Sequence, residues 1–180
     1  MINRVIKNNP PQALILILLG LNCCSVSSVR DSRLPQTINI AAWNVQALFD
    51  GTETGNEYGE YTASSGWSEE KYVARRAFIV QAANQLRADI LALIEVENLQ
   101  ILEALAADLW AKQKYPWTFF ASNPEASLGI GILSRYPFTK TKTHSAISGE
   151  ETTPRPMLEV WLEPAGQPLI LFICHWKSKL

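Results

Sequence analysis

The run from Asp89 to Val96 (DILALIEV) constrains the fold of this chain more than any other segment. It is almost continuously apolar and carries a carboxylate, Glu95, next to its end. This is the pattern of a strand that is buried on both of its faces. Such a strand must be covered from two sides, so the neighbouring sequence has to supply the covering elements.

Two helices are predicted, one on each side of this strand in the sequence. Ser68 can cap the first helix and Asn98 the second, because their side-chain oxygens can accept a hydrogen bond from a free N–H of the first turn. Apolar residues recur at helical spacing after both caps. They are Val73, Ala77, Val80, Ala83 and Leu86 in the first helix, and Leu102, Leu105 and Leu109 in the second.

Five further segments have the apolar pattern of strands. They are Thr37–Val45, Trp117–Ala121, Leu128–Ser134, Met157–Leu162 and Leu169–Cys174, and residues 163–168 form a hairpin turn signal between the last two. The order strand, helix, strand, helix, then mostly strands predicts an α/β fold. The two glycines of Leu128–Ser134 permit a close backbone approach. Cys174 is expected in the core, and His144 is expected to be exposed and inert.

The N-terminal segment predicts export. Residues 1–24 combine positive Arg4 and Lys7 with a short apolar stretch that is too short to span a bilayer, as in a signal peptide. Leu21-Asn22-Cys23 resembles a relaxed lipobox, so Cys23 is a candidate for lipidation and membrane anchoring. Residues 25–36 are polar and are predicted to be a tether. We therefore expect the protein in the cell envelope or outside the cell.

The charge of the chain excludes nucleic-acid binding by bulk attraction. The net charge is −1, which gives no basic footprint. Loss of Arg4 and Lys7 with a cleaved signal would make the rest more negative still. Any phosphate chemistry must therefore come from a local cluster or a bound cation.

Four polar residues at the ends of apolar strands are candidates for such a cluster: Asn44, Glu95, Arg155 and His175. A strand-end carboxylate is a hard oxygen ligand for a divalent cation, and arginine matches phosphate oxygens. A histidine can donate a proton near neutral pH. Each residue also has a structural interpretation, namely a surface acid, a turn cap, a solvated loop residue or a buried imidazole, and spacing alone does not decide between them.

Five segments, in order, resemble the endonuclease/exonuclease/phosphatase family. They are AAWNVQALFD (41–50), ADILALIEVEN (88–98), GIGILSRYPF (129–138), RPMLEV (155–160) and ICHWKSKL (173–180). The resemblance implies that Glu95 binds metal, that Asn44 lies at the phosphate and metal site, and that His175 is catalytic and contacts the scissile phosphate. It implies phosphate or substrate binding for Arg155 and Lys177, and a structural role for Glu97 and Asn98.

The resemblance also implies a fold and an activity. The implied fold is the first half of a DNase I-like α/β sandwich over residues 37–180, with one mixed sheet and flanking helices. The family's G-D-x-N and S-D-H motifs do not occur in this sequence, so we expect an incomplete chain, a sheet face left exposed, and a separately encoded C-terminal half as a candidate partner.

The implied function is an exported phosphodiesterase that depends on a divalent metal, with Mg²⁺ as the first candidate and Mn²⁺ or Ca²⁺ as alternatives. A nuclease acting on nucleic acid is favoured. A phosphoesterase for phospholipid or inositol phosphate is the alternative within the enzyme class. A non-catalytic remnant or envelope lipoprotein is the alternative outside it.

Overall fold

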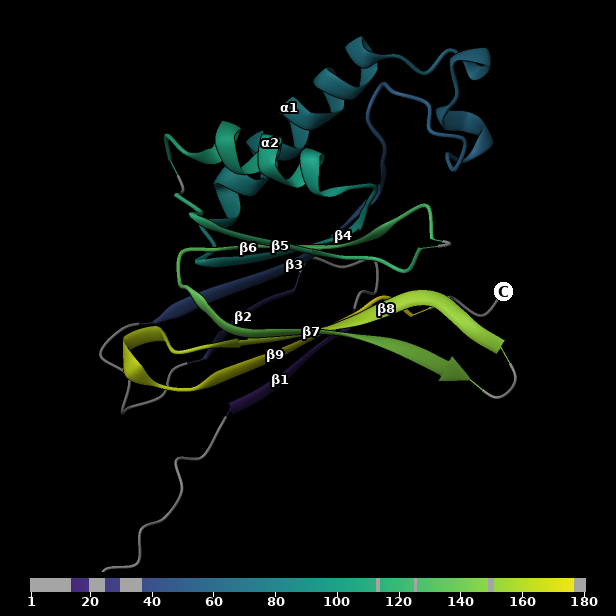
Figure 1. The fold of residues 1–180 in the computed structure, drawn as a ribbon. Coiled ribbons are helices and arrows are strands. Elements are labelled where there is room, and N and C mark those ends of the chain that lie inside the picture. The colour runs from purple at the N-terminus through teal and green to yellow at the C-terminus, as the bar shows by residue number, and fades with distance from the viewer. Residues whose placement is uncertain are drawn as a thin grey trace, which may run out of the picture.

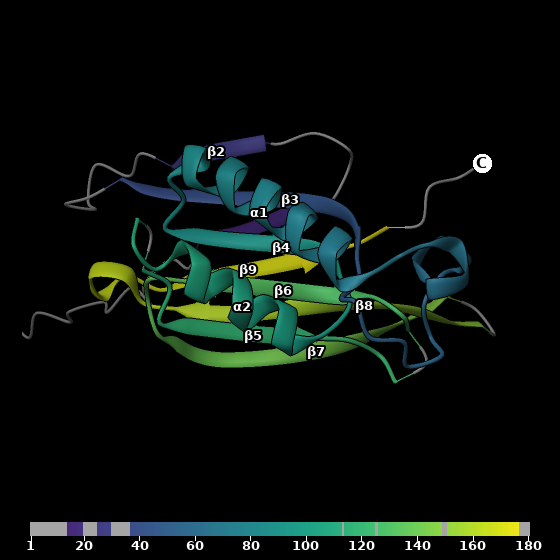
Figure 2. The ribbon, with the colours of Figure 1, turned by 90° about the horizontal axis from the view of Figure 1, so that it is seen from above.

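The computed structural model describes residues 14–19, 25–29, 37–112, 114–124, 126–148 and 151–176. Two helices, a five-stranded sheet and a four-stranded sheet lie on top of one another as three layers (Figure 1). Seen from above, both helices cross the five-stranded sheet (Figure 2). The α/β class predicted from the sequence is confirmed. Neither helix of the described chain has the length and apolar character of a membrane span.

The five-stranded sheet has the order β2-β3-β4-β6-β5, and the four-stranded sheet has the order β1-β9-β8-β7. Among the strand pairs of the described residues, β3–β4 and β1–β9 are parallel and the others are antiparallel. The strands are β1 (Leu14–Leu19), β2 (Ser25–Val29), β3 (Ile38–Leu48), β4 (Ile90–Val96), β5 (Trp117–Ala121), β6 (Gly129–Ser134), β7 (Phe138–Ser148), β8 (Glu151–Leu162) and β9 (Leu169–Cys174). The helices are α1 (Glu69–Leu86) and α2 (Leu99–Leu109), with short 3-10 turns at Gly59–Tyr61, Ala63–Ser65 and Pro164–Gly166.

The central strand β4 is covered on both faces, as its sequence requires. Leu91 and Leu93 pack into the core beneath the helices. Ile90 and Ile94 pack into a second core between the two sheets. All four side chains are fully buried. Each of the two apolar layers therefore depends on this strand.

The second sheet corrects the expectation of one mixed sheet with an exposed face. Leu158, Val160, Leu171 and Ile173 of β8 and β9 pack against the inner face of the five-stranded sheet. The strands β8 and β9 do not pair with the five-stranded sheet; they pair with each other, antiparallel, within the four-stranded sheet. The described chain thus supplies its own second sheet for the face that the sequence left uncovered.

The helix boundaries follow the predicted caps, but the predicted buried face of α1 is confirmed only in part, because Val80, Ala83 and Leu86 pack against the core whereas Val73 and Ala77 do not. Ser68 and Asn98 accept hydrogen bonds from the first turns of α1 and α2. In α1 the buried residues are Tyr72, Ile79 and Ala83, while Val73 is 43% exposed. Ala77 is also exposed. The buried stripe is rotated because Tyr72 takes the core position that an aliphatic pattern assigns to Val73.

The strand β7 was not predicted, and it changes the interpretation of His144. The segment is polar because every second residue, Lys140, Lys142 and His144, lies on the face of the sheet that also carries Glu159 and Trp161 of β8. His144 is neither fully exposed nor unpartnered: its Nε2 lies 2.6 Å from Oε2 of Glu159 on β8. Cys174, in contrast, is buried as predicted.

The strands β1 and β2 fall in the predicted signal peptide (1–24) and tether (25–36). The backbone of Leu14–Leu19 pairs with β9, and that of Ser25–Val29 pairs with β3. Export and lipidation stay predictions. Cys23 lies outside the described residues.

Gly129 offers a test of the close strand approach. A Cβ at this position would lie 2.4 Å from the carbonyl oxygen of Ala121, whereas a Cβ at Gly59 would meet nothing within 4 Å. We expect Gly129→Ala to lower the free energy of unfolding by about 1–3 kcal/mol, the usual cost of overpacking, and Gly59→Ala to leave it nearly unchanged. Urea unfolding of both variants measures this, and equal stabilities would contradict the packing described here.

Candidate active site

Asn44 and Glu95 lie where the regular pairing of β3 and β4 is interrupted. Ile94 pairs with Asn44 and Val96 pairs with Leu48, so that residues 45–47 bulge out opposite Glu95. Pairing with β6 also skips Glu95. Three residues here adopt left-handed backbone conformations without being glycine: Gln46 and Ala47 with φ of 58°, and Glu95 with φ of 69°. Bulges of this kind re-aim side chains and are frequent beside active sites.

The bulge at Glu95 changes which face the end of β4 presents. Ile90, Ala92 and Ile94 point into the layer between the sheets. Regular alternation would place Val96 on the same face as Ile94. Instead Val96 packs beneath the helices. The extra residue, Glu95, is thereby left free of strand pairing at the rim of the two cores.

The structure brings three predicted site residues together at this rim. The Asn44 amide Nδ2 donates to Glu95 Oε1 at 2.8 Å. His175 follows β9 of the other sheet, and its Nε2 lies 3.1 Å from the same Oε1. The Ala47 N–H donates to Glu95 Oε2 at 2.9 Å. The carboxylate of Glu95 is therefore the point at which the two sheets meet through polar groups.

These contacts keep Glu95 ionised. Burial by itself raises the pKa of a carboxyl group. Here the hydrogen bonds from His175, Asn44 and the Ala47 N–H, together with the charge of His175, outweigh burial and hold the pKa of Glu95 below its usual value. The side chains of Glu95 and His175 remain 20% and 13% exposed. An ionised carboxylate is thus held in place and still reaches solvent.

Arg155 supports the segment that carries His175. Its Nη1 donates to the carbonyl oxygen of Trp176 at 2.9 Å, so β8 fixes the backbone directly after the histidine. No contact between Arg155 and Glu95 is among those of the described chain. Lys177 lies outside the described residues.

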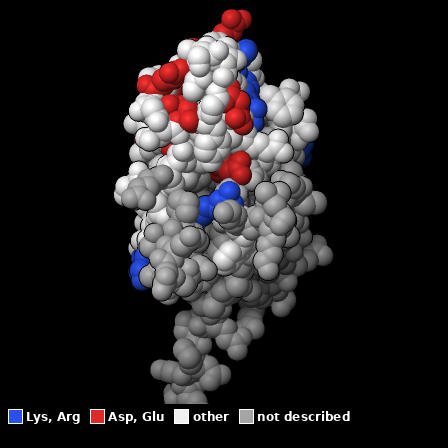
Figure 3. Space-filling view, turned by 90° about the vertical axis from the view of Figure 1, so that its right-hand side faces the viewer, with Lys and Arg blue, Asp and Glu red and all other residues white. Residues whose placement is uncertain are grey.

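A loop between β3 and α1 overhangs this end of the sheet. It is ordered by aromatic packing, with ring centroids of Phe49 and Tyr61, and of Tyr61 and Trp67, each 4.8 Å apart. Its charged residues are all acidic: Asp50, Glu53, Glu57 and Glu60. Figure 3 shows acidic side chains gathered on this face of the molecule. The rim of the site is therefore electronegative on the loop side.

Glu97 and Asn98 have the structural roles predicted for them. Asn98 caps α2 through its Oδ1 and donates from Nδ2 to Asp50 Oδ2 at 3.0 Å. Glu97 Oε2 accepts the Asp50 N–H at 2.9 Å. Burial, with the nearby charges of Asp50 and Glu57, raises the pKa of Glu97 to about 7 despite that hydrogen bond.

The donor set fits a hard divalent cation that keeps most of its water. Among the described residues, no group of three or more His, Cys, Asp or Glu side chains is placed to enclose a metal ion. Mg²⁺ does not require such a cage, because it is commonly held by one or two carboxylates, with water and substrate oxygens completing its shell. The ionised and partly exposed Glu95 carboxylate meets that requirement.

The family model for the endonuclease/exonuclease/phosphatase family matches residues 41–173. The chain belongs to this family. The match begins at the fourth residue of β3, just before Asn44, and ends one residue before the end of β9. Enzymes of the family hydrolyse phosphoesters and generally use divalent metal ions. No curated protein matched the chain in a sequence comparison.

Solved structures of the family share the fold at low sequence identity. The human Nocturnin catalytic domain is 17% identical, with a TM-score of 0.56 over 87% of this chain and 54% of its own. TDP2 from Caenorhabditis elegans is 17% identical, with a TM-score of 0.55 over 79% of this chain and 36% of its own. A family protein from Leptotrichia buccalis is 13% identical, with a TM-score of 0.53 over 78% and 54%. This chain therefore spans between about a third and about half of their lengths.

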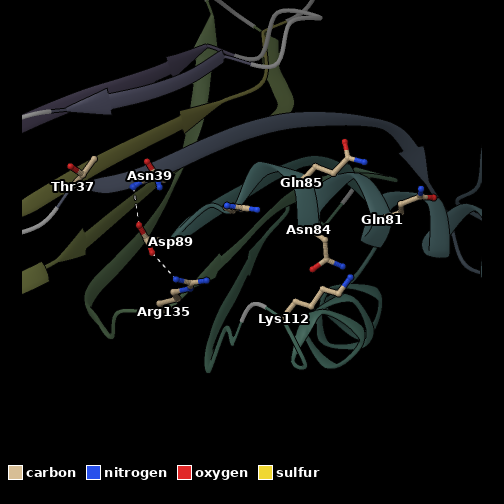
Figure 4. A pocket seen from close by; sticks show the side chains of 9 residues that line it. Thr37, Asn39, Gln81, Asn84, Gln85, Asp89, Lys112 and Arg135 are labelled. Carbon is tan, nitrogen blue, oxygen red and sulfur yellow. Dashed lines mark hydrogen bonds and ion pairs between the residues drawn. The ribbon is translucent and has the colours of Figure 1, made fainter.

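A hollow of about 1090 Å³ lies at the opposite end of β3 and β4 from Asn44 and Glu95 (Figure 4). Its lining includes Asn39 and Asp89, which precede or begin these strands, and Arg135, whose Nη1 lies 2.9 Å from Asp89 Oδ1. None of the predicted site residues that the structure describes, namely Asn44, Glu95, Arg155 and His175, lines it. Because Asn44 and Glu95 sit at the carboxyl ends of the two parallel strands, this hollow is separate from the candidate active site.

Glu97 predicts a specific pH dependence of stability. A carboxyl group whose pKa is higher in the folded state stabilises the fold below its unfolded value, near 4.5, and this contribution is lost as the pH rises through about 7. We expect the free energy of unfolding of Glu97→Gln, relative to wild type, to be about 1 kcal/mol higher at pH 8 than at pH 4.5. This is less than the full linkage value because the side chain is partly exposed.

Urea unfolding in the presence of EDTA at both pH values measures this difference. Glu60→Gln, at an exposed position of the acidic loop between β3 and α1, controls for the loss of one negative charge. An identical difference between Glu97→Gln and wild type at both pH values would contradict the assignment.

Proposed function

We propose that this chain carries the metal- and phosphate-binding side of an exported phosphodiesterase, with Mg²⁺ as its cofactor and nucleic acid as its substrate. The observation that supports this most directly is the convergence of Asn44, from one sheet, and His175, which follows β9 of the other, on the Glu95 carboxylate. A merely structural acid at a strand end would not need partners from both.

Each residue has a definite part in this proposal. Glu95 holds the divalent cation, which when bound neutralises charge on the phosphoryl oxygens. Asn44 fixes the Glu95 carboxylate and offers its amide to a phosphate oxygen. His175 hydrogen-bonds a phosphate oxygen and donates a proton as charge develops. Arg155 fixes the backbone beside His175, and Lys177 adds a positive charge to the same segment.

The surroundings of the site bear on the substrate. Trp176 follows His175 directly and is 58% exposed, and an exposed aromatic ring offers a surface on which a nucleic-acid base can stack. This supports a nuclease. The acidic loop, in contrast, repels a long polyanion and favours a small phosphoester, such as a phospholipid or inositol phosphate head group, as the second candidate.

The location is also a proposal. The signal-like residues 1–24 support export, and Cys23 supports attachment to a membrane through a lipid. Mass spectrometry of the mature N-terminus tests both.

Metal binding should depend on Glu95. We expect Mn²⁺ or Mg²⁺ to bind wild type, and Glu95→Gln to weaken binding by at least ~10-fold, the lower end of the losses seen when groups around a metal site are removed. Glu97→Gln is the matched control, because it makes the same substitution two residues away, where the carboxylate accepts the Asp50 N–H instead. Calorimetry of the three proteins decides, and equal affinities would remove the metal assignment.

Turnover should depend on His175 and on the metal. We expect EDTA to abolish phosphodiester hydrolysis by this protein and His175→Ala to lower kcat by at least ~10²-fold, the size expected for a positioned proton donor. Nicking of plasmid DNA and degradation of RNA are assayed beside sphingomyelin and inositol phosphate hydrolysis. Head-group release without nuclease activity would favour the second candidate, and binding without any turnover would favour a non-catalytic protein.

A further inference from the structure

Arg75 of α1 reaches across to the bulge that shapes the candidate active site. Its Nη2 donates to the carbonyl oxygen of Val45 at 3.0 Å and also to that of Gln46. The Tyr61 hydroxyl, from the overhanging loop, donates to the same Gln46 oxygen at 3.5 Å. Two carbonyl groups that strand pairing leaves free are thus bound from the helix side.

No described acid holds this guanidinium in place. Within the described chain, Arg75 forms no ion pair, and its Nε is buried without a hydrogen-bond partner. Leaving a buried donor unsatisfied is costly. The position of Arg75 is therefore explained by what its Nη2 binds, and the two described partners of that atom are both bulge carbonyls.

The bulge is a backbone that needs support. Gln46 and Ala47 are consecutive residues with φ of 58°, and left-handed conformations of residues other than glycine each cost of order 1–3 kcal/mol. The same conformation aims two amides at the site: the Gln46 N–H donates to Asn44 Oδ1 at 2.8 Å, and the Ala47 N–H donates to Glu95 Oε2. Loss of the bulge would remove these two hydrogen bonds and release the side chains of Asn44 and Glu95.

We propose that Arg75 is a positioning residue of the active site, which acts by fixing the 45–47 bulge and, through it, Asn44 and Glu95. Among the described contacts, its Nη2 binds the carbonyl oxygens of Val45 and Gln46 and it touches neither the Asn44 nor the Glu95 side chain. Its consequence for metal binding rests on the function proposed above, whereas its consequence for the bulge does not.

Arg76 provides a matched control one residue away. It lies on the same helix, but its Nε is 2.8 Å from Asp108 Oδ2 of α2. Its Nη1 donates to the Tyr72 hydroxyl of α1 itself at 3.4 Å. Removing its guanidinium should therefore affect the packing of α1 on α2 without reaching the bulge.

The test compares Arg75→Met, Arg75→Lys and Arg76→Met with wild type. Amide hydrogen exchange at Gln46 and Ala47, followed by NMR, reports on the bulge. Calorimetry with Mn²⁺ reports on Glu95, and the melting temperature reports on overall stability.

We expect Arg75→Met to accelerate exchange at both amides and to weaken Mn²⁺ binding by ~10-fold or more, the scale of losses for groups that orient a metal ligand. Arg75→Lys should restore part of both, because an ammonium group can still donate to the two carbonyls. Arg76→Met should lower the melting temperature and leave exchange at these two amides unchanged.

Unchanged exchange at Gln46 and Ala47 in Arg75→Met would overturn the proposal, as would equal acceleration in Arg76→Met. If Arg75→Met does not fold, Arg75→Lys carries the test, and exchange identical to wild type together with unchanged Mn²⁺ affinity would overturn it. Absence of Mn²⁺ binding by wild type would refute the proposed function. The exchange measurement would still decide, by itself, whether Arg75 fixes the bulge.

Discussion

The apolar layer between the two sheets brings the parts of the candidate active site together. Leu158, Val160, Leu171 and Ile173 pack there against the face of β3 and β4 that carries Ile40, Ala92 and Ile94. At ~25 cal/mol for each Å² of apolar surface removed from water, several fully buried aliphatic side chains on each side make this packing a dominant stabilising contribution. His175 meets Glu95 because β9 is fixed in this layer, and no local preference near His175 would place it there.

The polar site lies at the rim of this layer for a physical reason. A carboxylate inside the layer would lose its hydration without compensation, which costs several kcal/mol. At the rim, a bulge frees Glu95 from strand pairing, three donors surround it, and part of the side chain still reaches water. The candidate site therefore consists of a strained backbone that is held by its neighbours, and the supporting groups are as much a part of it as Asn44, Glu95 and His175.

The support comes from elements that are far apart in the sequence. Arg75 binds the bulge from α1, the aromatic residues Phe49, Tyr61 and Trp67 order the loop beyond it, and Arg155 fixes the backbone after His175. This arrangement explains how two consecutive left-handed residues persist without glycine. It also explains why the loop that overhangs the site is ordered although its sequence is rich in glycine, serine and threonine.

The sequence by itself determined the local secondary-structure elements and the residues that are candidates for binding or catalysis. Continuous apolar runs predicted the buried strands, side-chain oxygens at Ser68 and Asn98 predicted the helix starts, and polar residues at strand ends predicted Asn44, Glu95 and His175 as candidates. The predictions of the buried strand β4 and of the two helix starts are confirmed, because burial on two faces and the capping of free N–H groups are local requirements that leave a direct trace in the residue pattern.

Only the tertiary structure decided how these elements combine. The division into two sheets depends on which strands pair, and apolar alternation does not record the partner. The polar strand β7, the partnership of His144 with Glu159, and the buried stripe of α1 at Tyr72 all depend on neighbours from other elements. The bulge at Gln46 and Ala47 contains no glycine, so the sequence gives no sign of its left-handed backbone. Contacts with Arg75 and Glu95 hold this conformation, which the two residues do not favour by themselves. Long-range contacts, not local preference, therefore turn three candidate residues into one site.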